Sequence, residues 1–353
     1  RHLSALGHLF VQALALCQAA GMVSLGRVAL DGTKLRANAS KRKAMSYARM
    51  TEKEKALAVE VSALLAEAER IDKAEDRQFG KDRRGDELPA ELARRETRLV
   101  KIREAKAALE AEAAEAAREQ AEAKARERGD DDDTTTGKGA EAAATATPKP
   151  KAQRNFTDPD SKIMLTADGA FHQCYNAAAV VDADHQVIVA AELGTNATDI
   201  ATLMPMTHQV VANTGVVPAQ VLADAGYSSA ANCDAAAEYT ATCGTEFFIA
   251  PGRRRRDDPV PVAPRGRIPA GATAKQRMAR KLTTKEGQRV YARRKAIVEP
   301  VFGQMSTLQN AKHLLLRGFE QARAEWLLLA ACHNLRKLHG HIGIAGLSAL
   351  PAQ

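Results

Sequence analysis

Two aspartates stand at the ends of short apolar runs, in positions where a carboxylate can do chemistry. Asp31 follows the run V-A-L, and Asp224 follows the run V-L-A. If these runs form neighbouring strands, the two carboxylates face each other and repel unless a cation lies between them. Mg²⁺ or Mn²⁺ is the expected cation, because no His/Cys cluster with zinc spacing accompanies the two acids. Two structural roles stay open: Asp-Gly is a common turn pair, and Asp224 can cap a following helix.

A third acid, Glu299, lies in the segment A-I-V-E-P-V-F-G. Its helical neighbours are apolar, so the pattern predicts a buried carboxylate, which is costly unless it is paired or coordinates a metal. The alternative is a helix that begins at Pro300 and leaves Glu299 near a positive N-terminus.

The positive charge of the chain is concentrated in one segment. The whole chain has 51 Lys and Arg against 43 Asp and Glu, a formal charge of +8. Residues 253–295 alone carry +12, and the remainder carries −4. The segment begins with Arg253, Arg254, Arg255 and Arg256 and ends with Lys295, just before Glu299. A solvated face is the simplest interpretation of a charge run, but this density favours a track for the phosphate backbone of duplex DNA. With 4% aromatic residues, base stacking on single strands is less favoured.

Composition places the chain among globular proteins. It is 45% hydrophobic over 353 residues, which excludes collagenous, mucin-like and mostly disordered classes and allows one to three domains. The five cysteines are scattered without a C-x-x-C pair, so neither a disulfide framework nor a zinc knuckle is indicated. A reducing cytoplasm is the expected location.

The opening segment, residues 2–26, contains no formal charge. A membrane span or signal peptide is one interpretation. However, Ser4, His8 and Gln12 recur at i, i+4 and i+8, with Phe10 and Cys17 on another side, which is typical of a buried amphipathic helix. We expect residues 1–27 to be the helical end of an N-terminal domain. Because the chain starts with Arg1 rather than Met, we expect a fragment or a trimmed product.

The next part of the chain predicts a strand followed by a long helical insertion. Residues 28–40 are expected to hold the first strand of the sheet, and residues 41–128 to form two long helices in a hairpin with a loop at 78–89. A solvated helical spacer is the alternative for this hairpin. Residues 129–156 have almost no large apolar side chains and predict a flexible linker.

Residues 157–340 are expected to complete the domain that begins with the first strand, and 341–353 to form a tail. Alternation predicts a hairpin over 171–192, and later segments alternate between strand and helix before the chain becomes helical to its end. The fold class is therefore α/β: a mixed sheet flanked by helices, interrupted by a long helical-hairpin insertion, with a helical C-terminus.

Four blocks resemble one known family. They are V-A-L-D-G-T-K-L-R-A-N-A-S, T-D-P-D-S-K-I-M with D-G-A-F-H-Q-C-Y-N-A-A-A-V-V-D, V-L-A-D-A-G-Y, and Y-A-R-R-K-A-I-V-E-P-V-F-G-Q. In this order they are similar to bacterial insertion-sequence transposases of the DDE type, and the C-terminal helices are similar too. The resemblance implies an RNase H-like catalytic core in which Asp31, Asp224 and Glu299 are the D, D and E. It also implies a helix-rich DNA-binding part lying partly upstream of Arg1.

The resemblance further implies a mechanism. The three carboxylates would hold two divalent ions, water would cut a phosphodiester at an element end, and the freed 3′-OH would attack target DNA. Tyr291 and Arg294 match residues that lie near the DNA backbone in relatives, whereas Ser306 replaces a common lysine.

We therefore expect double-stranded DNA as partner, a homodimer on DNA, no membrane, and a cytoplasmic, nucleoid-associated protein. A metal-dependent nuclease without strand transfer and a catalytically decayed DNA-binding relic remain alternatives.

Overall fold

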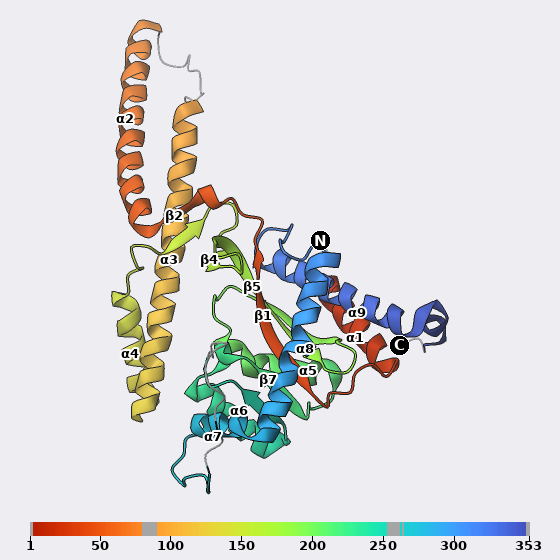
Figure 1. The fold of residues 1–353 in the computed structure, drawn as a ribbon. Helices are drawn as coiled ribbons and strands as arrows, with labels where there is room; N and C mark the ends of the chain where they lie inside the picture. Colours follow the sequence, from red (N-terminus) through yellow and green to blue (C-terminus); the bar gives the residue numbers. More distant parts are fainter. Residues whose placement is uncertain (1–2, 80–89, 253–261, 263–264, 351–353) are drawn as a thin grey trace. The chain divides into compact units, whose positions relative to one another are not determined.

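A computed structural model describes residues 3–79, 90–252, 262 and 265–350 (Figure 1). The chain divides into two compact units. The sheet unit comprises Arg1–Ala39 and Asp160–Gln353, and the helical unit comprises Ser40–Pro159. These limits lie close to the boundaries expected for the helical insertion and its linker.

The sheet unit is built on a six-stranded mixed sheet. Its middle strand, β1, pairs antiparallel with β5 and parallel with β7. β6 and β4 pair with β5, and β8 pairs parallel with β7, which gives the order β6-β5-β1-β7-β8 with β4 beside the start of β5. The bounds are β1 Val28–Arg36, β4 Lys162–Leu165, β5 Phe171–Asp182, β6 Ile188–Gly194, β7 Gln220–Ala223 and β8 Glu246–Ile249. The predicted hairpin is the antiparallel pair β5–β6.

Helices cover both faces of this sheet (Figure 1). They are α1 Leu3–Ala19, α5 Leu203–Thr214, α6 Ala230–Cys243, α7 Ala274–Thr283, α8 Lys285–Leu308 and α9 Phe319–Ala349, with single 3₁₀ turns η2 Ile200–Thr202 and η3 Ala225–Tyr227. Alternate residues of β5 enter opposite cores, as the two-residue period of a strand requires. Ala177 and Ala179 pack in the cluster around Trp326, whereas Ala178 and Val180 pack in the cluster around Tyr227.

α1 packs within the sheet unit. Phe10 and Ala13 are buried in the cluster around Trp326, and Leu14 and Cys17 are buried in the cluster around Tyr227. The amphipathic pattern thus serves packing against the sheet and α9. Within the described residues, no helix is both long and apolar enough to cross a membrane.

The helical unit contains the predicted hairpin as α2 Tyr47–Phe79 and α3 Ala90–Arg128. Buried Met50, Leu57, Leu99 and Ile102 lie along the seam between the two helices. Short elements η1 Lys41–Lys43, β2 Ala44–Ser46 and β3 Gln153–Asn155 close the base of this unit, where β2 and β3 pair antiparallel.

The linker predicted for residues 129–156 is wrong, because this segment contains α4 Asp132–Thr145 and β3. Asp131 caps α4 by accepting a hydrogen bond from the Thr134 N–H at 2.7 Å. Small residues let α4 approach α3 closely: a Cβ added to Gly139 would lie 2.8 Å from Glu122 Cγ. The scarcity of large apolar side chains therefore reflects close helix packing.

Candidate active site

Asp31 and Asp224 come together at adjacent strands of the sheet. The parallel register pairs Leu30 of β1 with Ala223 of β7, so the next residue on each strand is one of the aspartates. Partial burial raises the pKa of Asp31, Arg294 opposes this rise, and the nearby charge of Asp224 adds to it. The two acids thus lie close together, as their position after the two apolar runs predicts.

A protein cation already contacts this pair. Arg294 of α8 donates from Nη1 to Asp31 Oδ2 at 2.8 Å, and only 9% of its side chain is exposed. In this structure the Arg294 guanidinium is buried and paired with Asp31. Tyr291, one turn earlier, is half-buried, and burial raises its pKa.

Of the two structural roles, capping by Asp224 is present, whereas Asp31 and Gly32 lie inside β1 and form no turn. Asp31 Oδ1 accepts from the Gly32 N–H at 2.9 Å, and Asp224 Oδ1 accepts from the Gly226 N–H at 2.7 Å as the cap of η3. These bonds orient both carboxylates. Each aspartate keeps its second oxygen for another partner, which for Asp31 is Arg294.

A third aspartate, Asp199, lies at this site, and the sequence patterns did not indicate it. Asp199 Oδ1 accepts hydrogen bonds from Asn176 Nδ2 at 2.5 Å and Lys34 Nζ at 3.5 Å. A Cβ added to Gly32 would lie 2.6 Å from Asp199 Oδ1, and one added to Gly226 would lie 3.6 Å from Asp199 Oδ2. Glycines just after both Asp31 and Asp224 were the available signal, since they make room for another side chain.

Glu299 does not lie where its neighbours suggested. It is exposed, whereas Val298 and Val301 on the same helix are buried. Both interpretations of its position are wrong: the carboxylate is not buried, and Pro300 lies inside α8 rather than at its start. Among the described residues no group of three or more His, Cys, Asp or Glu side chains could hold a metal ion, so Glu299 does not complete such a group with the two aspartates.

The donor chemistry of the aspartate pair nevertheless suits a divalent ion. Two carboxylates on neighbouring strands offer oxygen ligands, which Mg²⁺ and Mn²⁺ prefer. Asp31 and Asp224 could hold such an ion if Arg294 withdraws, and a third carboxylate would have to approach from Asp199 or from Glu299.

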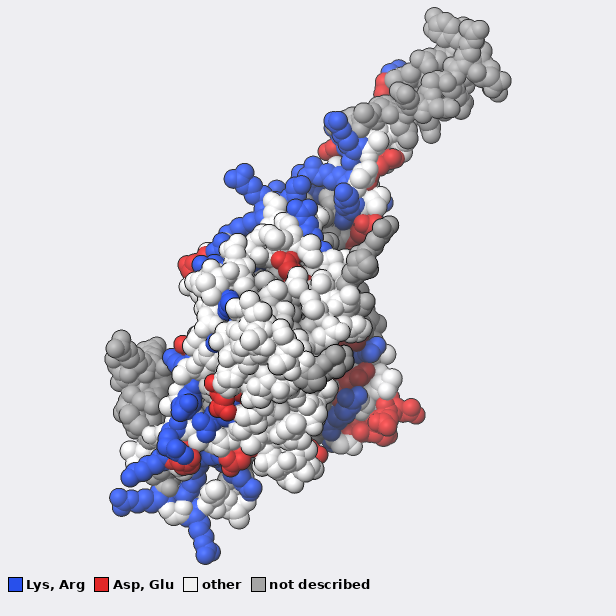
Figure 2. Space-filling model, turned by 90° about the vertical axis from the view of Figure 1, so that its right-hand side faces the viewer, with Lys and Arg blue, Asp and Glu red and all other residues white. Residues whose placement is uncertain are grey.

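Only part of the predicted basic segment lies within the described residues. Arg253–Arg256 lie outside the described residues, and Lys295 is exposed on α8. Figure 2 shows Lys and Arg gathered toward the lower end of the face it presents, at the level of α7, while its middle is largely uncharged. Some of the basic side chains of α7 have structural roles: Lys281 Nζ lies 3.8 Å from the centroid of the Phe248 ring, and Arg277 donates to the Ala272 carbonyl.

The segment that carries Tyr291, Arg294 and Glu299 also matches a known family. Residues 267–339 match the family model described as the transposase DDE domain. This match confirms the resemblance to DDE-type transposases. The DDE-domain match spans α7, α8 and much of α9 and does not reach Asp31 or Asp224. No curated protein and no solved structure matches the chain.

Proposed function

We propose that this chain is the transposase of an insertion sequence, which cuts DNA at element ends and joins the freed 3′ ends to target DNA. The observation that carries the proposal is the pairing of Asp31 and Asp224 on adjacent parallel strands, next to a helix that matches the transposase DDE domain. DDE transposases act on DNA, and the local positive charge of residues 253–295 supports a polyanionic substrate.

The strand order supports an RNase H-like core for this enzyme. β1, β5 and β6 form an antiparallel group, and β7 and β8 continue the sheet in parallel on the other side of β1. Helices pack on both faces. Parallel strands end at one edge of a sheet, which is where ligands bind in open α/β sheets.

Divalent metal binding is part of the proposal. Asp31 and Asp224 would hold the ions together with Glu299, as the D, D and E of the family. A bound divalent ion supplies an activated water and stabilises charge on the leaving oxygen. The residues of the chain orient this site: the backbone N–H groups of Gly32 and Gly226 fix the two aspartates, and Arg294 neutralises Asp31.

The test is nicking of a supercoiled plasmid that carries candidate element ends, in Mg²⁺ and then in Mn²⁺. Asp224→Asn should abolish nicking while leaving DNA binding largely intact. Asp234→Asn on α6, which changes an exposed aspartate, is the matched control and should nick like the wild type. Nicking by Asp224→Asn at the wild-type rate would refute the assignment of the aspartate pair. A joining assay with a pre-cut end then separates a transposase from a nuclease without strand transfer.

A decayed DNA-binding relic is the second candidate, and two observations favour it. Arg294 pairs with Asp31, and among the described residues no group of three or more His, Cys, Asp or Glu side chains could hold a metal ion. Folded wild-type protein that binds DNA but does not nick it in either metal would select this candidate.

A further inference from the structure

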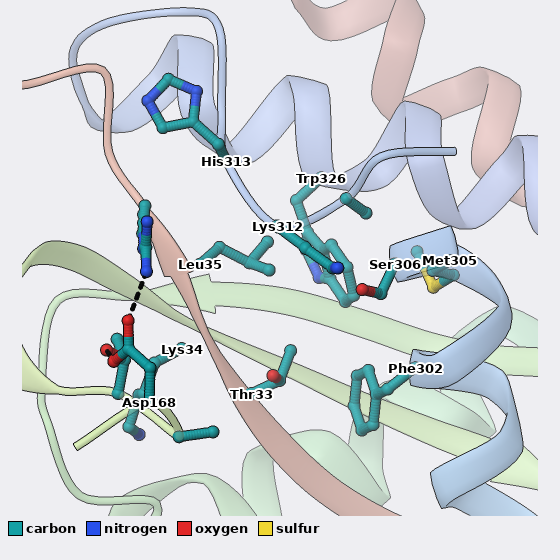
Figure 3. Close-up of a pocket in the computed structure, with 14 residues that line it drawn as sticks. Thr33, Lys34, Leu35, Asp168, Phe302, Met305, Ser306, Lys312, His313 and Trp326 are labelled. Atoms are coloured by element: carbon teal, nitrogen blue, oxygen red, sulfur yellow. Dashed lines mark hydrogen bonds and ion pairs between the residues drawn. The ribbon is translucent and has the colours of Figure 1, made fainter. Parts of the chain in front are cut away.

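A cavity of about 560 Å³ lies beside the second half of β1 (Figure 3). Its walls come from β1, the end of α8, the segment between α8 and α9, α9 itself, and the loop between β4 and β5. All of these parts belong to the sheet unit. None of the lining residues is one of the three predicted catalytic acids.

Two of the elements that line the cavity, β1 and α8, also carry predicted catalytic acids. Thr33, which lines the cavity, lies two residues after Asp31 and so on the same face of β1, about 6.6 Å further along the strand. On α8, Phe302 and Ser306 follow Glu299 at i+3 and i+7, which places all three on one helical face. A DNA strand held at Asp31 would therefore reach the cavity within about two base steps of 3.4 Å.

One cation in this cavity has no counter-charge. Arg36 is paired with Asp168, and Lys34 with Asp199. Lys312, by contrast, is exposed and makes no ion pair within the described part of the chain. Figure 3 shows its side chain extending toward Ser306.

The backbone around Lys312 is held in place. Arg36 N–H donates to the Lys312 carbonyl at 3.1 Å, and Leu314 N–H donates to the Arg36 carbonyl at 2.8 Å. This short ladder extends the sheet beyond β1 and fixes the origin of the lysine side chain. The lysine side chain therefore starts from a fixed point of a cavity that Ser306 and Thr33 also line.

The opposite part of the wall is apolar. The Phe302 ring stacks on Trp326, with 6.5 Å between ring centroids and 20° between planes. Phe302 is half-buried and Trp326 is fully buried, so Phe302 presents the accessible apolar surface. A ligand that fits this cavity carries negative charge, accepts hydrogen bonds and has an apolar part.

We propose that this cavity holds one nucleotide of the substrate DNA, with a backbone phosphate on Lys312 and Ser306 and the sugar against Phe302. Lys312 thereby supplies a cation on the α8 side of the site, where position 306 carries only a hydroxyl. The proposal rests on the proposed function, because DNA is the source of the phosphate.

The test measures DNA binding in EDTA, so that no cutting occurs, with a fluorescein-labelled duplex that carries a candidate element end. Lys312→Ala should weaken binding about tenfold, the effect of one charge-assisted contact. It should also reduce the salt dependence of binding by about one phosphate contact. Ser306→Lys introduced into Lys312→Ala should restore most of the affinity, because it returns a cation to the same cavity. Lys124→Ala, at an exposed lysine of the helical unit, is the matched control.

The single tryptophan of the chain gives a second, independent readout. Because Phe302 stacks on Trp326, a sugar bound against Phe302 should change the emission of Trp326, and Lys312→Ala should reduce this change. Wild-type affinity and salt dependence in Lys312→Ala would overturn the proposal. If Lys312→Ala binds DNA like the wild type and the wild type nicks plasmid, only the assignment of the cavity fails. If the wild type neither binds nor nicks DNA, the proposed function fails as well.

Discussion

The Arg294 guanidinium lies 2.8 Å from the Asp31 carboxylate, across 263 positions of the sequence. The pair joins α8 to β1 and lies beside Asp224. A cation thus stands where two neighbouring carboxylates need one, and it comes from the protein itself. Binding of a divalent ion at Asp31 must therefore compete with this guanidinium.

Replacing Arg294 by Gln should destabilise the metal-free protein by about 3 kcal/mol. The change leaves the largely buried Asp31 carboxylate without its cation, and breaking such a pair is strongly unfavourable. Added Mg²⁺ should recover part of this loss, because a ligand that binds only the folded state stabilises it. The measurement is the thermal unfolding midpoint with and without Mg²⁺.

The control for this change is Arg289→Gln. Arg289 pairs with Glu286 on the exposed surface of the same helix, and such pairs contribute little. The unfolding free energy of Arg289→Gln should stay within about 0.5 kcal/mol of the wild-type value. An Arg294→Gln midpoint that matches this control, and that does not respond more to Mg²⁺ than the wild type, would contradict competition at Asp31.

Gly32→Ala should lower the free energy of unfolding by about 1–3 kcal/mol, the usual cost of overpacking. The new Cβ would lie 2.6 Å from Asp199 Oδ1 and 3.2 Å from Asn176 Oδ1, so Asp199 must move. Gly303→Ala on α8 is the matched change in open space and should raise stability by about 0.5–1 kcal/mol, since alanine favours a helix. The measurement is the free energy of unfolding in urea for both variants. Equal effects would mean that Asp199 does not crowd Gly32.

His333 should make the protein less stable as the pH falls. Burial lowers the pKa of this imidazole to about 4 from its ordinary value of 6.5, and its Nε2 lies 2.9 Å from the Gln186 carbonyl. Between these two values the unfolded chain binds a proton that the folded chain does not, so the stability contributed by His333 is lost as the pH drops through this window. The loss is about 3 kcal/mol when complete.

The measurement for His333 is the free energy of unfolding from neutral pH down to about pH 4, for the wild type and for His333→Gln. Glutamine keeps a donor for the Gln186 carbonyl and does not titrate, so the variant should lose less stability on acidification. Parallel pH profiles for the two proteins would show that His333 is not the group responsible.

Asn334→Ala should lower the free energy of unfolding by about 2 kcal/mol. The Asn334 amide accepts from the Ile188 N–H and donates to the Ile188 carbonyl, both at 2.8 Å, and so completes the hydrogen bonds of the edge strand β6 from α9. Asn213→Ala is the milder control, because Asn213 makes one bond to the same strand, at the Val189 carbonyl, and should cost about 1 kcal/mol. Chemical unfolding of both variants measures the two losses of stability. A larger loss for Asn213→Ala than for Asn334→Ala would contradict this role of Asn334.

Local sequence patterns predicted most of the elements that build the site. The apolar runs before Asp31 and Asp224 are strands, the alternation over 171–192 is a hairpin, and the helical stripes of the insertion are α2 and α3. These features depend on side-chain period and on short-range turn chemistry, which a sequence displays directly. The resemblance to DDE-type transposases rests on blocks at the same strands and on α8, and the match over 267–339 confirms it there.

The tertiary structure decided which side chains meet. Glu299 follows the buried Val298 by one position, but one residue turns an α-helix by about 100°, so its neighbours do not determine its own exposure. Arg294 reaches Asp31, and Asp199 reaches Gly32, only because strand order and helix rotation bring distant segments together. The sequence by itself determined the two aspartates and the strands that carry them. The contacts that surround them depend on long-range packing, which no local pattern encodes.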